Sequence, residues 1–247
     1  MLQEKKIYGL VGKNIDYSFS KKYFSEKFIK QNFKNCIYNN FDIENLKELK
    51  KIFTINNLMG LNITIPFKEK IIPLLDSLNV DAFEIGAVNT VKITSDNKLI
   101  GHNTDYIGFT RAIKPYLTQK HKSAIILGTG GSSKAVKYSL NKLNISSINV
   151  SRKKTKGNLT YRELDSYKMK KCDIIINCSP VGTFPKIKES PKIPYQYINE
   201  SHVCFDLIYN PQETKFLKES KKRNARTVNG LKMLELQAEE SWKIWNS

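Results

Sequence analysis

The chain has 247 residues, which suits one large domain or two small ones, and its 40% of hydrophobic residues can bury a sizeable core. No stretch approaches the roughly 18 apolar residues of a membrane span. The formal net charge of +18 invites a nucleic-acid interpretation, but only five of the 41 basic residues are arginines and the lysines are spread along the whole chain, so we expect no nucleic-acid partner.

Strand-like and helix-like segments alternate in the first part of the chain. Apolar runs predict strands over residues 7–12, 36–41, 59–65, 87–93 and 99–101. Helices are predicted over roughly 20–33 and 43–53. Pro66 suits the first turn of a further helix, for which Ile71, Leu75 and Leu78 supply part of an apolar stripe.

The pattern changes after Asp105, where helices separate short apolar strands in the manner of a parallel α/β sheet. The strands are predicted over residues 123–127, 147–150, 173–177, 203–207 and 226–228. The helices are predicted over 106–117, 134–143, 161–167 and 215–222, with a last one from about 231. Only one short helix fits between Val150 and Asp173, so we expect this region to be trimmed relative to a full dinucleotide-binding domain.

These elements predict an α/β protein with two lobes. We expect residues 1–105, joined by the C-terminal helix over 231–247, to form one lobe, and residues 106–230 to form the other.

A glycine-rich turn follows the strand predicted over 123–127. It consists of Gly128, Thr129, Gly130, Gly131, Ser132 and Ser133. Glycines at such a turn let the backbone approach a pyrophosphate, and the N-terminus of the following helix offers N–H groups to the phosphates. The pattern is GxGGxS rather than GxGxxG, so an ordinary glycine turn is the alternative to a dinucleotide site.

The end of the next predicted strand indicates which dinucleotide would bind. An NAD site usually has Asp or Glu there to accept from the ribose 2′-hydroxyl. This chain has Ser151, Arg152 and Lys153 instead. Because a guanidinium can contact a 2′-phosphate through charge-assisted hydrogen bonds, the turn favours NADP(H) over NAD(H). The alternative is a solvated basic turn in a lysine-rich protein.

Small polar and charged groups recur at the ends of elements in the first half of the chain. They are Ser18 and Ser20, the run from Leu61 to Lys68, the run from Gly86 to Thr90, and Asn103 to Asp105. Such groups suit a hydroxylated, carboxylated small molecule. Taken singly, each has a plainer interpretation: Lys68 as a solvated lysine, for example, and Asp105 as a helix N-cap.

Six of these motifs, in this order, resemble the shikimate dehydrogenase family along essentially the whole chain. The matching residues are Asn62, Thr64, Pro66 and Lys68; Ala87–Thr90; Asn103–Asp105; Gly128–Ser133; Arg152; and Asn229, Gly230, Leu231, Met233, Leu234 and Gln237. The resemblance implies a substrate-binding lobe followed by a Rossmann-like, doubly wound NADP-binding lobe. It also implies the reversible NADPH-dependent reduction of 3-dehydroshikimate to shikimate, a step of chorismate and aromatic amino acid biosynthesis.

The resemblance also implies roles for individual residues. Lys68 and Asp105 match the catalytic pair. The substrate-binding residues would be Ser18, Ser20, Thr64, Asn89, Tyr209 and Gln237. The cofactor-binding residues would be Gly128, Thr129, Gly130, Gly131, Ser132, Ser151, Arg152, Lys153 and Gly230, with Gly230 beside the nicotinamide.

The chain departs from the family near its start, where His-Ser-x-Ser-Pro is replaced by Tyr17 to Lys21, although both serines are kept. Two other functions stay open at this point. One is a quinate/shikimate dehydrogenase with relaxed substrate and NAD use, against which the basic turn argues. The other is a non-catalytic ligand- or nucleic-acid-binding protein, against which the retained Lys68 and Asp105 argue.

The four cysteines form no CxxC pair and there are only three histidines, so we expect reduced thiols and no metal site. The N-terminus lacks the layout of a signal peptide, which predicts a cytoplasmic protein. The sequence leaves open whether the protein is a monomer or a homodimer.

Overall fold

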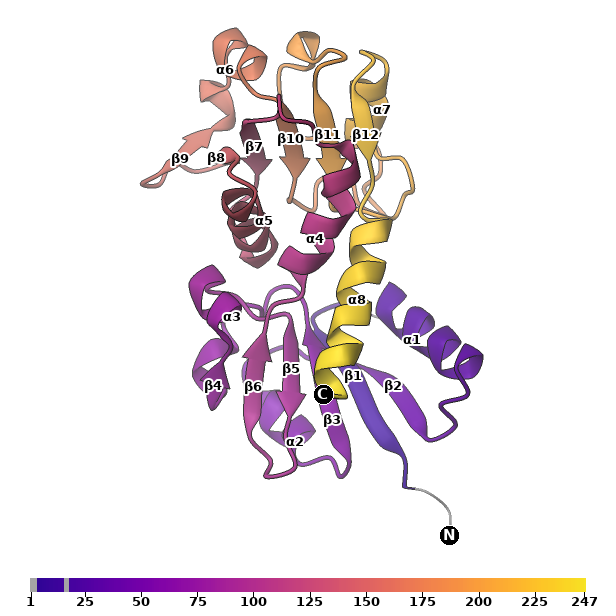
Figure 1. Ribbon diagram of the computed structural model, residues 1–247. Helices are drawn as coiled ribbons and strands as arrows, with labels where there is room; N and C mark the ends of the chain where they lie inside the picture. Colours follow the sequence, from indigo (N-terminus) through magenta and orange to yellow (C-terminus); the bar gives the residue numbers. More distant parts are fainter. Residues whose placement is uncertain (1–3, 16–17) are drawn as a thin grey trace. The chain divides into compact units, whose positions relative to one another are not determined.

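A computed structural model describes residues 4–15 and 18–247, so Tyr17 of the departure noted above lies outside the described residues. The chain divides into two compact units: Met1–Thr104 with Ala238–Ser247, and Asp105–Gln237. Each unit contains one sheet flanked by helices, which confirms the predicted α/β class (Figure 1). The helix α8 (Leu231–Trp245) contributes its first half to the second unit and its second half to the first.

The sheet of the first unit is mixed, with the strand order β2-β1-β3-β5-β6-β4. β1 pairs in parallel with both β2 and β3, whereas β5 is antiparallel to β3 and β6. The strands are β1 (Lys6–Gly12), β2 (Cys36–Asp42), β3 (Leu58–Ile63), β4 (Ser77–Leu78), β5 (Thr90–Ile93) and β6 (Leu99–His102). The helices are α1 (Phe19–Lys30), α2 (Leu49–Phe53) and α3 (Val80–Ile85).

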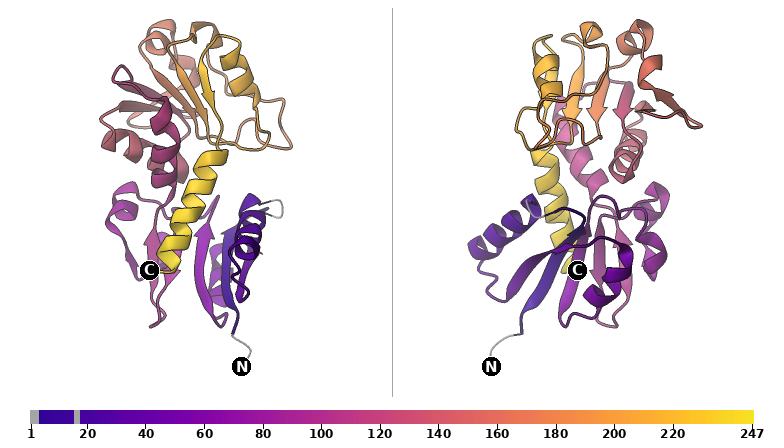
Figure 2. Two further views of the ribbon diagram at one scale, coloured as in Figure 1. Left: turned by 45° about the vertical axis from the view of Figure 1, so that its right-hand side comes forward. Right: turned by 180° about the vertical axis from the view of Figure 1, so that it is seen from behind.

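Alternate residues of these strands face two hydrophobic clusters, as the pleat of a sheet requires. On one face, Val11, Leu61 and Val91 pack with residues of α2 and α3; Figure 2 shows α2 over this face when the molecule is seen from behind. On the other face, Tyr8 packs with aromatic residues of α1 and with Trp245 of α8. This packing attaches the end of α8 to the first unit.

The prediction of a helix after Pro66 is wrong. The segment forms turns and one short 3₁₀ helix, Ile72–Leu74. Pro73 has no N–H to continue a helical ladder, and the carbonyl of Lys68 accepts from the amide of Val88, 20 residues away, at 2.7 Å. Ile71 is nevertheless buried, and Ile72, Leu75 and Leu78 pack, partly buried, against the same hydrophobic cluster as β3.

The sheet of the second unit is parallel throughout, with the strand order β12-β11-β10-β7-β8-β9. The strands are β7 (Ser123–Leu127), β8 (Ser146–Ser151), β9 (Asn158–Thr160), β10 (Ile174–Asn177), β11 (Val203–Asp206) and β12 (Arg226–Val228). The helices are α4 (Asp105–Ile113), α5 (Gly131–Lys142), α6 (Ser166–Lys170), α7 (Lys215–Lys221) and the first half of α8. The predicted Rossmann-like arrangement is therefore confirmed.

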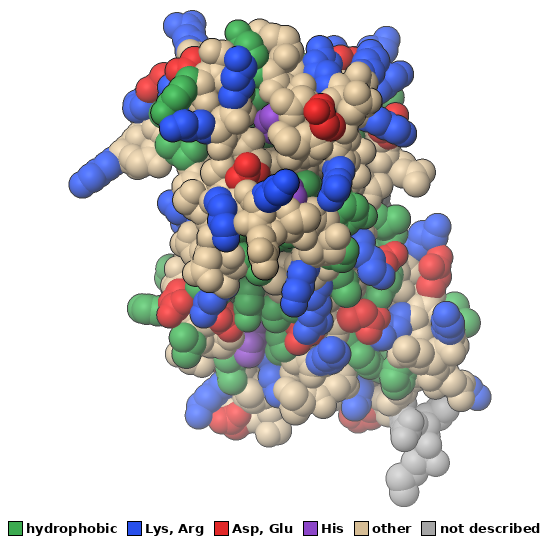
Figure 3. All heavy atoms as spheres, turned by 45° about the horizontal axis from the view of Figure 1, so that its top comes forward, with side chains coloured by type: hydrophobic (Ala, Val, Ile, Leu, Met, Phe, Trp, Pro, Cys, Tyr) green, Lys and Arg blue, Asp and Glu red, His purple; other side chains and the backbone are tan. Residues whose placement is uncertain are grey.

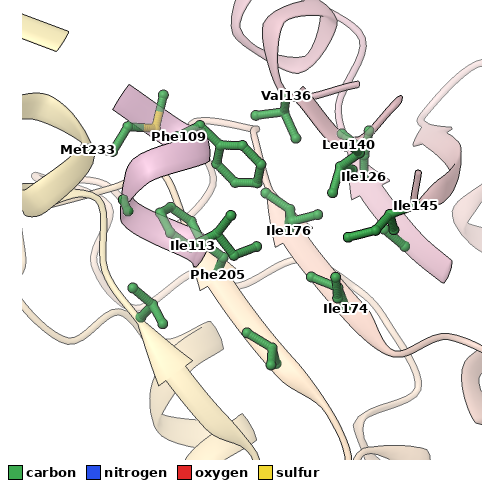
Figure 4. Packing of buried hydrophobic residues seen from close by; sticks show 14 residues of the cluster. Phe109, Ile113, Ile126, Val136, Leu140, Ile145, Ile174, Ile176, Phe205 and Met233 are labelled. Atoms are coloured by element: carbon green, nitrogen blue, oxygen red, sulfur yellow. The ribbon is translucent and has the colours of Figure 1, made fainter. Parts of the chain in front are cut away.

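Helices cover both faces of this sheet. α4, α5 and the start of α8 pack on one face, where Phe109 and Phe205 meet edge to face with ring centroids 5.1 Å apart (Figure 4). Residues of α6 and α7, including Met169 and Phe216, cover the other face. Because parallel strands are buried on both faces, they read as continuous apolar runs, which is why the sequence marks them clearly.

The region after Val150 differs from its prediction. It contains a short strand, β9, that pairs in parallel with β8, and the helix α6 begins only at Ser166. β9 is three residues long, too short for an alternating pattern to mark it.

No helix of the described residues is long and apolar enough to cross a membrane. On the face drawn in Figure 3, Lys and Arg side chains are interspersed with acidic and uncharged ones rather than gathered in one patch.

Candidate active site

Two of the predicted substrate-binding residues lie at the start of α1. Ser18 is the N-cap of this helix, and its Oγ accepts a hydrogen bond from the amide of Ser20 at 3.2 Å. Ser20 is buried, and its side chain lies close to Tyr38 of β2, where it opposes the rise in the pKa of that phenol. Burial raises the pKa of Tyr38 well above its ordinary value, so this phenol stays protonated and donates to Oδ1 of Asn62 at 2.8 Å.

Thr64 and Lys68 follow the end of β3. The amide of Thr64 donates to the carbonyl of Val11 at 2.9 Å, and the carbonyl of Lys68 accepts from Val88, which precedes β5. These bonds tie the segment to the strands on both of its sides. Thr64 and Lys68 are both half-buried.

Asn89, which precedes β5, is buried and held on both edges of its amide group. Its Oδ1 accepts from the backbone amide of Thr104 at 2.6 Å, and its Nδ2 donates to the Thr104 hydroxyl at 3.0 Å. The Asn89 carbonyl also accepts from Ile63 at the end of β3 at 2.8 Å. The structure thus places the Asn89 backbone beside Ile63, the residue that precedes Thr64.

Two buried residues with polar groups behind these side chains, Tyr38 and Ser241, are not among the residues that the sequence predicted for the site. Ser241 lies four residues after Gln237, one turn further along α8, so helical spacing from a motif residue would have singled it out. Tyr38 carries no such signal, because it is an ordinary residue of a strand.

The catalytic candidate Asp105 and the substrate candidate Gln237 are both buried residues of the second unit. Asp105 is the first residue of α4, and Gly108 lies one turn later. A Cβ at Gly108 would lie 2.6 Å from the carbonyl of Met233 and 3.0 Å from the Cβ of Gln237. The glycine therefore permits α4 and α8 to cross closely, which brings Gln237 near the start of α4. Lys68 belongs to the first unit, so its pairing with Asp105 stays a prediction.

The glycine loop connects β7 to α5, as predicted. Gly128 has a φ of +129°, and a Cβ added to it would lie 3.3 Å from the backbone of Cys178. A side chain there would therefore be both strained and crowded. Gly130 is the N-cap of α5 and forms no side-chain cap, and an added Cβ would meet nothing within 4 Å. The loop thus leaves open space at the N-terminus of a 12-residue helix, the arrangement that suits a pyrophosphate.

The basic turn follows β8 and is held by its own polar groups. The Ser151 hydroxyl donates to the Lys153 carbonyl and accepts from Asn158 Nδ2, which also bonds that carbonyl at 3.1 Å. Arg152 is exposed, and its guanidinium opposes the burial that raises the pKa of the neighbouring Tyr161. Arg152 and Lys153 are therefore presented to solvent on a turn of defined shape.

Tyr209 and Gly230 lie on adjoining backbone segments. The Gly230 amide donates to the carbonyl of Ile208 at 3.1 Å, and a Cβ at Gly230 would come within 2.1 Å of the Leu207 carbonyl oxygen. Only glycine fits this approach. Asp206, a buried residue at the end of β11, accepts from the Ile208 amide at 3.0 Å and so holds the start of the same segment.

The comparisons with known proteins agree on one family. Residues 10–91 match the family model described as the shikimate dehydrogenase substrate binding domain. A curated shikimate dehydrogenase (NADP(+)) from Methanococcus maripaludis is 42% identical over 97% of this chain and 91% of its own length. A solved shikimate dehydrogenase from Aquifex aeolicus has a TM-score of 0.87 at 37% identity, covering 98% and 92% of the two chains. A quinate dehydrogenase from Corynebacterium glutamicum, solved with NAD, has the same TM-score at 25% identity, covering 98% and 94%.

Proposed function

Since this chain belongs to the shikimate dehydrogenase family, we propose that it catalyses the reversible NADPH-dependent reduction of 3-dehydroshikimate to shikimate. The observation that carries the proposal is the agreement over nearly the whole length with relatives named as NADP-dependent shikimate dehydrogenases. The reaction is a step of the shikimate pathway, and the enzyme is an oxidoreductase acting on a CH–OH group.

The first unit binds the substrate in this proposal. The hydroxyls of Ser18 and Ser20 donate to the substrate carboxylate, since both lie at the start of α1, where the helix dipole also favours an anion. Asn89 and Thr64, at the ends of neighbouring strands, bind the ring hydroxyls. Gln237 and Tyr209 complete the set from the second unit.

Lys68 and Asp105 perform the proton chemistry. When bound, NADPH would supply the hydride that reduces the ketone carbon. The Lys68 ammonium donates a hydrogen bond to the carbonyl oxygen, stabilises the negative charge that develops there and supplies the proton. The Asp105 carboxylate orients the ammonium group and accepts from a ring hydroxyl of the substrate.

The residues of the second unit fit NADP(H). The open space beside Gly130 and the uncapped start of α5 suit the pyrophosphate, with Thr129, Gly131 and Ser132 completing the loop. Arg152 and Lys153 contact the 2′-phosphate, with Ser151 shaping the turn, and Gly230 adjoins the nicotinamide. A carboxylate at the end of β8, which would accept from an unphosphorylated ribose, is replaced by these cations.

The alternative is a quinate/shikimate dehydrogenase that also accepts NAD. Its support is the likeness to the quinate dehydrogenase solved with NAD, at 25% identity. The 42% identity to a relative named for NADP(+) and the basic turn at Arg152 favour the narrower function. We also place the enzyme in the cytoplasm, as a monomer or homodimer, because its reductant is NADPH and its four cysteines are free thiols.

The test is the rate of NADP⁺ reduction by the purified protein with shikimate, beside controls with quinate and with NAD⁺. We expect fast turnover only with shikimate and NADP⁺. Similar efficiency with quinate or NAD⁺ would move the protein to the alternative function. Folded protein that turns over none of the pairs would contradict both.

A further inference from the structure

One buried hydroxyl of the first unit contacts three segments that lie far apart in the chain. It belongs to Ser241 of α8, a residue with no exposed surface. This hydroxyl lies 2.9 Å from Asn62 Nδ2 in β3, 2.8 Å from Thr90 Oγ1 in β5 and 3.2 Å from the hydroxyl of Thr104, the residue before α4. These three residues belong to three separate sequence motifs, Asn62–Lys68, Ala87–Thr90 and Asn103–Asp105.

The hydrogen bonds around Ser241 close into a ring in which every hydroxyl donates once. The Thr104 backbone amide can only donate, so its 2.6 Å bond identifies the oxygen edge of the Asn89 amide. Asn89 Nδ2 then donates to the Thr104 hydroxyl. When Thr90 donates to Asn89 Oδ1 at 3.2 Å, the Ser241 hydroxyl is left to donate to Thr90 and the Thr104 hydroxyl to donate to Ser241. Asn62 Nδ2 donates to Ser241 as well, which fills both acceptor positions of this hydroxyl.

The ring continues toward the start of α1 through Asn62 and Tyr38. The Asn62 side chain accepts from Tyr38 at 2.8 Å, and the Ser20 side chain lies close to Tyr38. Tyr38, beside Ser20, and Asn89 are therefore the two ends of one chain of hydrogen bonds, with Ser241 at its centre. Because the members are buried, a broken bond leaves polar groups without water to replace it.

We infer that Ser241 is a positioning residue for substrate binding: it sets the orientation of the Asn89 amide relative to Ser20 without being a binding group in the proposed function. This inference rests on that function, which assigns Ser20 to the substrate carboxylate and Asn89 to a ring hydroxyl. A substrate held by both groups needs a set distance between them, and the α8 hydroxyl provides the shared anchor.

The test compares the steady-state kinetics of Ser241→Ala with those of the wild type. We expect the KM for shikimate to rise about tenfold, because the Asn89 amide loses its fixed orientation, while the KM for NADP⁺ stays within about twofold. The matched control is Ser220→Ala, which removes a buried hydroxyl of the second unit that donates to the Phe216 carbonyl of its own helix, α7, at 2.9 Å. A loss of stability alone would lower the active fraction in both variants and leave the KM for shikimate unchanged.

A double-mutant cycle separates positioning from general structural damage. In the Asn89→Ala background there is no amide to orient, so Ser241→Ala should change the KM for shikimate by less than about twofold. If Ser241→Ala does not fold, Ser241→Cys fills the site with a slightly larger thiol that is a much weaker donor, and should show the same rise in KM.

The outcomes are distinct. Wild-type protein that does not turn over shikimate overturns the proposed function and this inference together. Wild-type turnover with an unchanged KM in Ser241→Ala, or with full additivity in the cycle, overturns the inference alone. A rise in KM for shikimate that disappears in the Asn89→Ala background supports it.

Discussion

The carboxyl group of Asp206 and the hydroxyl group of Thr214 are joined by a 2.6 Å hydrogen bond between two residues with no exposed surface. Asp206 also accepts from Asn177 Nδ2 at 3.1 Å and from the Ile208 amide. These bonds connect the ends of β10 and β11 to the segment that carries Tyr209 and to the N-cap of α7. The Asp206 carboxyl group, which all of these bonds share, is titratable.

Asp206→Asn should remove a pH dependence of stability. Burial raises the pKa of Asp206 from its ordinary 3.8 to about 7, despite opposing hydrogen bonds. Between these pH values the folded chain keeps a proton that the unfolded chain has released, so the free energy of unfolding falls as the pH rises to about 7 and levels off above. A displacement of this size corresponds to roughly 4 kcal/mol.

The measurement is urea unfolding of both proteins at several pH values between 4 and 8. We expect Asp206→Asn to imitate the protonated form, since its amide can donate to Thr214, and to lose less stability than the wild type across this interval. Parallel curves for the two proteins would contradict the assignment of a proton to Asp206.

Lys68→Ala should lose turnover without losing the cofactor. General acid catalysis contributes about 10²- to 10⁴-fold, so we expect kcat to fall by about 10³-fold while the Kd for NADPH, measured by its fluorescence, changes by less than twofold. Lys70→Ala is the matched control, because Lys70 is an exposed lysine two residues away. A kcat near that of the wild type in Lys68→Ala would rule out its catalytic role.

Arg152→Ala should weaken NADP⁺ selectively. The exposed guanidinium is proposed to bind the 2′-phosphate, which NAD⁺ lacks, so the KM for NADP⁺ should rise roughly tenfold or more and that for NAD⁺ should stay nearly constant. Arg162→Ala, which removes an exposed arginine of the same unit, is the control. Equal changes in the KM for NADP⁺ and the KM for NAD⁺ would show that Arg152 does not bind the 2′-phosphate.

Gly130→Ala should separate cofactor binding from stability. A methyl group at this position meets no protein atom within 4 Å and Gly130 has a negative φ of −82°, so the thermal midpoint should stay within about 2 °C of the wild type. The same methyl group would occupy the space proposed for the pyrophosphate, so the Kd for NADPH should rise about tenfold or more. In contrast, Gly230→Ala should lower the midpoint, because its Cβ would overlap a backbone oxygen. Unchanged NADPH binding in Gly130→Ala would contradict a pyrophosphate site at the loop.

Patterns within a few residues marked much of the fold in advance. The apolar strands of the second sheet, the turn at Gly128 and the start of α8 are each specified by neighbouring residues. The helix α3 was missed although local signals exist: Asn79 caps its first turn, and Gly86 ends it in the left-handed conformation. A closer search for caps would have found it.

The remaining differences have long-range causes. The segment after Pro66 has the apolar spacing of a helix, but its Lys68 carbonyl bonds to Val88, a partner that no local pattern reveals. β9 exists because β8 offers it an edge to pair with. In both cases tertiary hydrogen bonds override the local preference.

By itself, the sequence determined the α/β class and the order of the motifs, because periodicity, glycine turns and motif spacing are properties of neighbouring positions. The candidate site residues followed from the resemblance of those motifs to the shikimate dehydrogenase family. Only the tertiary structure decided that Ser241 connects Asn62, Thr90 and Thr104, and that Asp206 is a buried carboxyl group bonded to Thr214. The physical reason is that burial and hydrogen-bond partners depend on which distant segments pack together, and patterns among neighbouring residues do not show which segments those are.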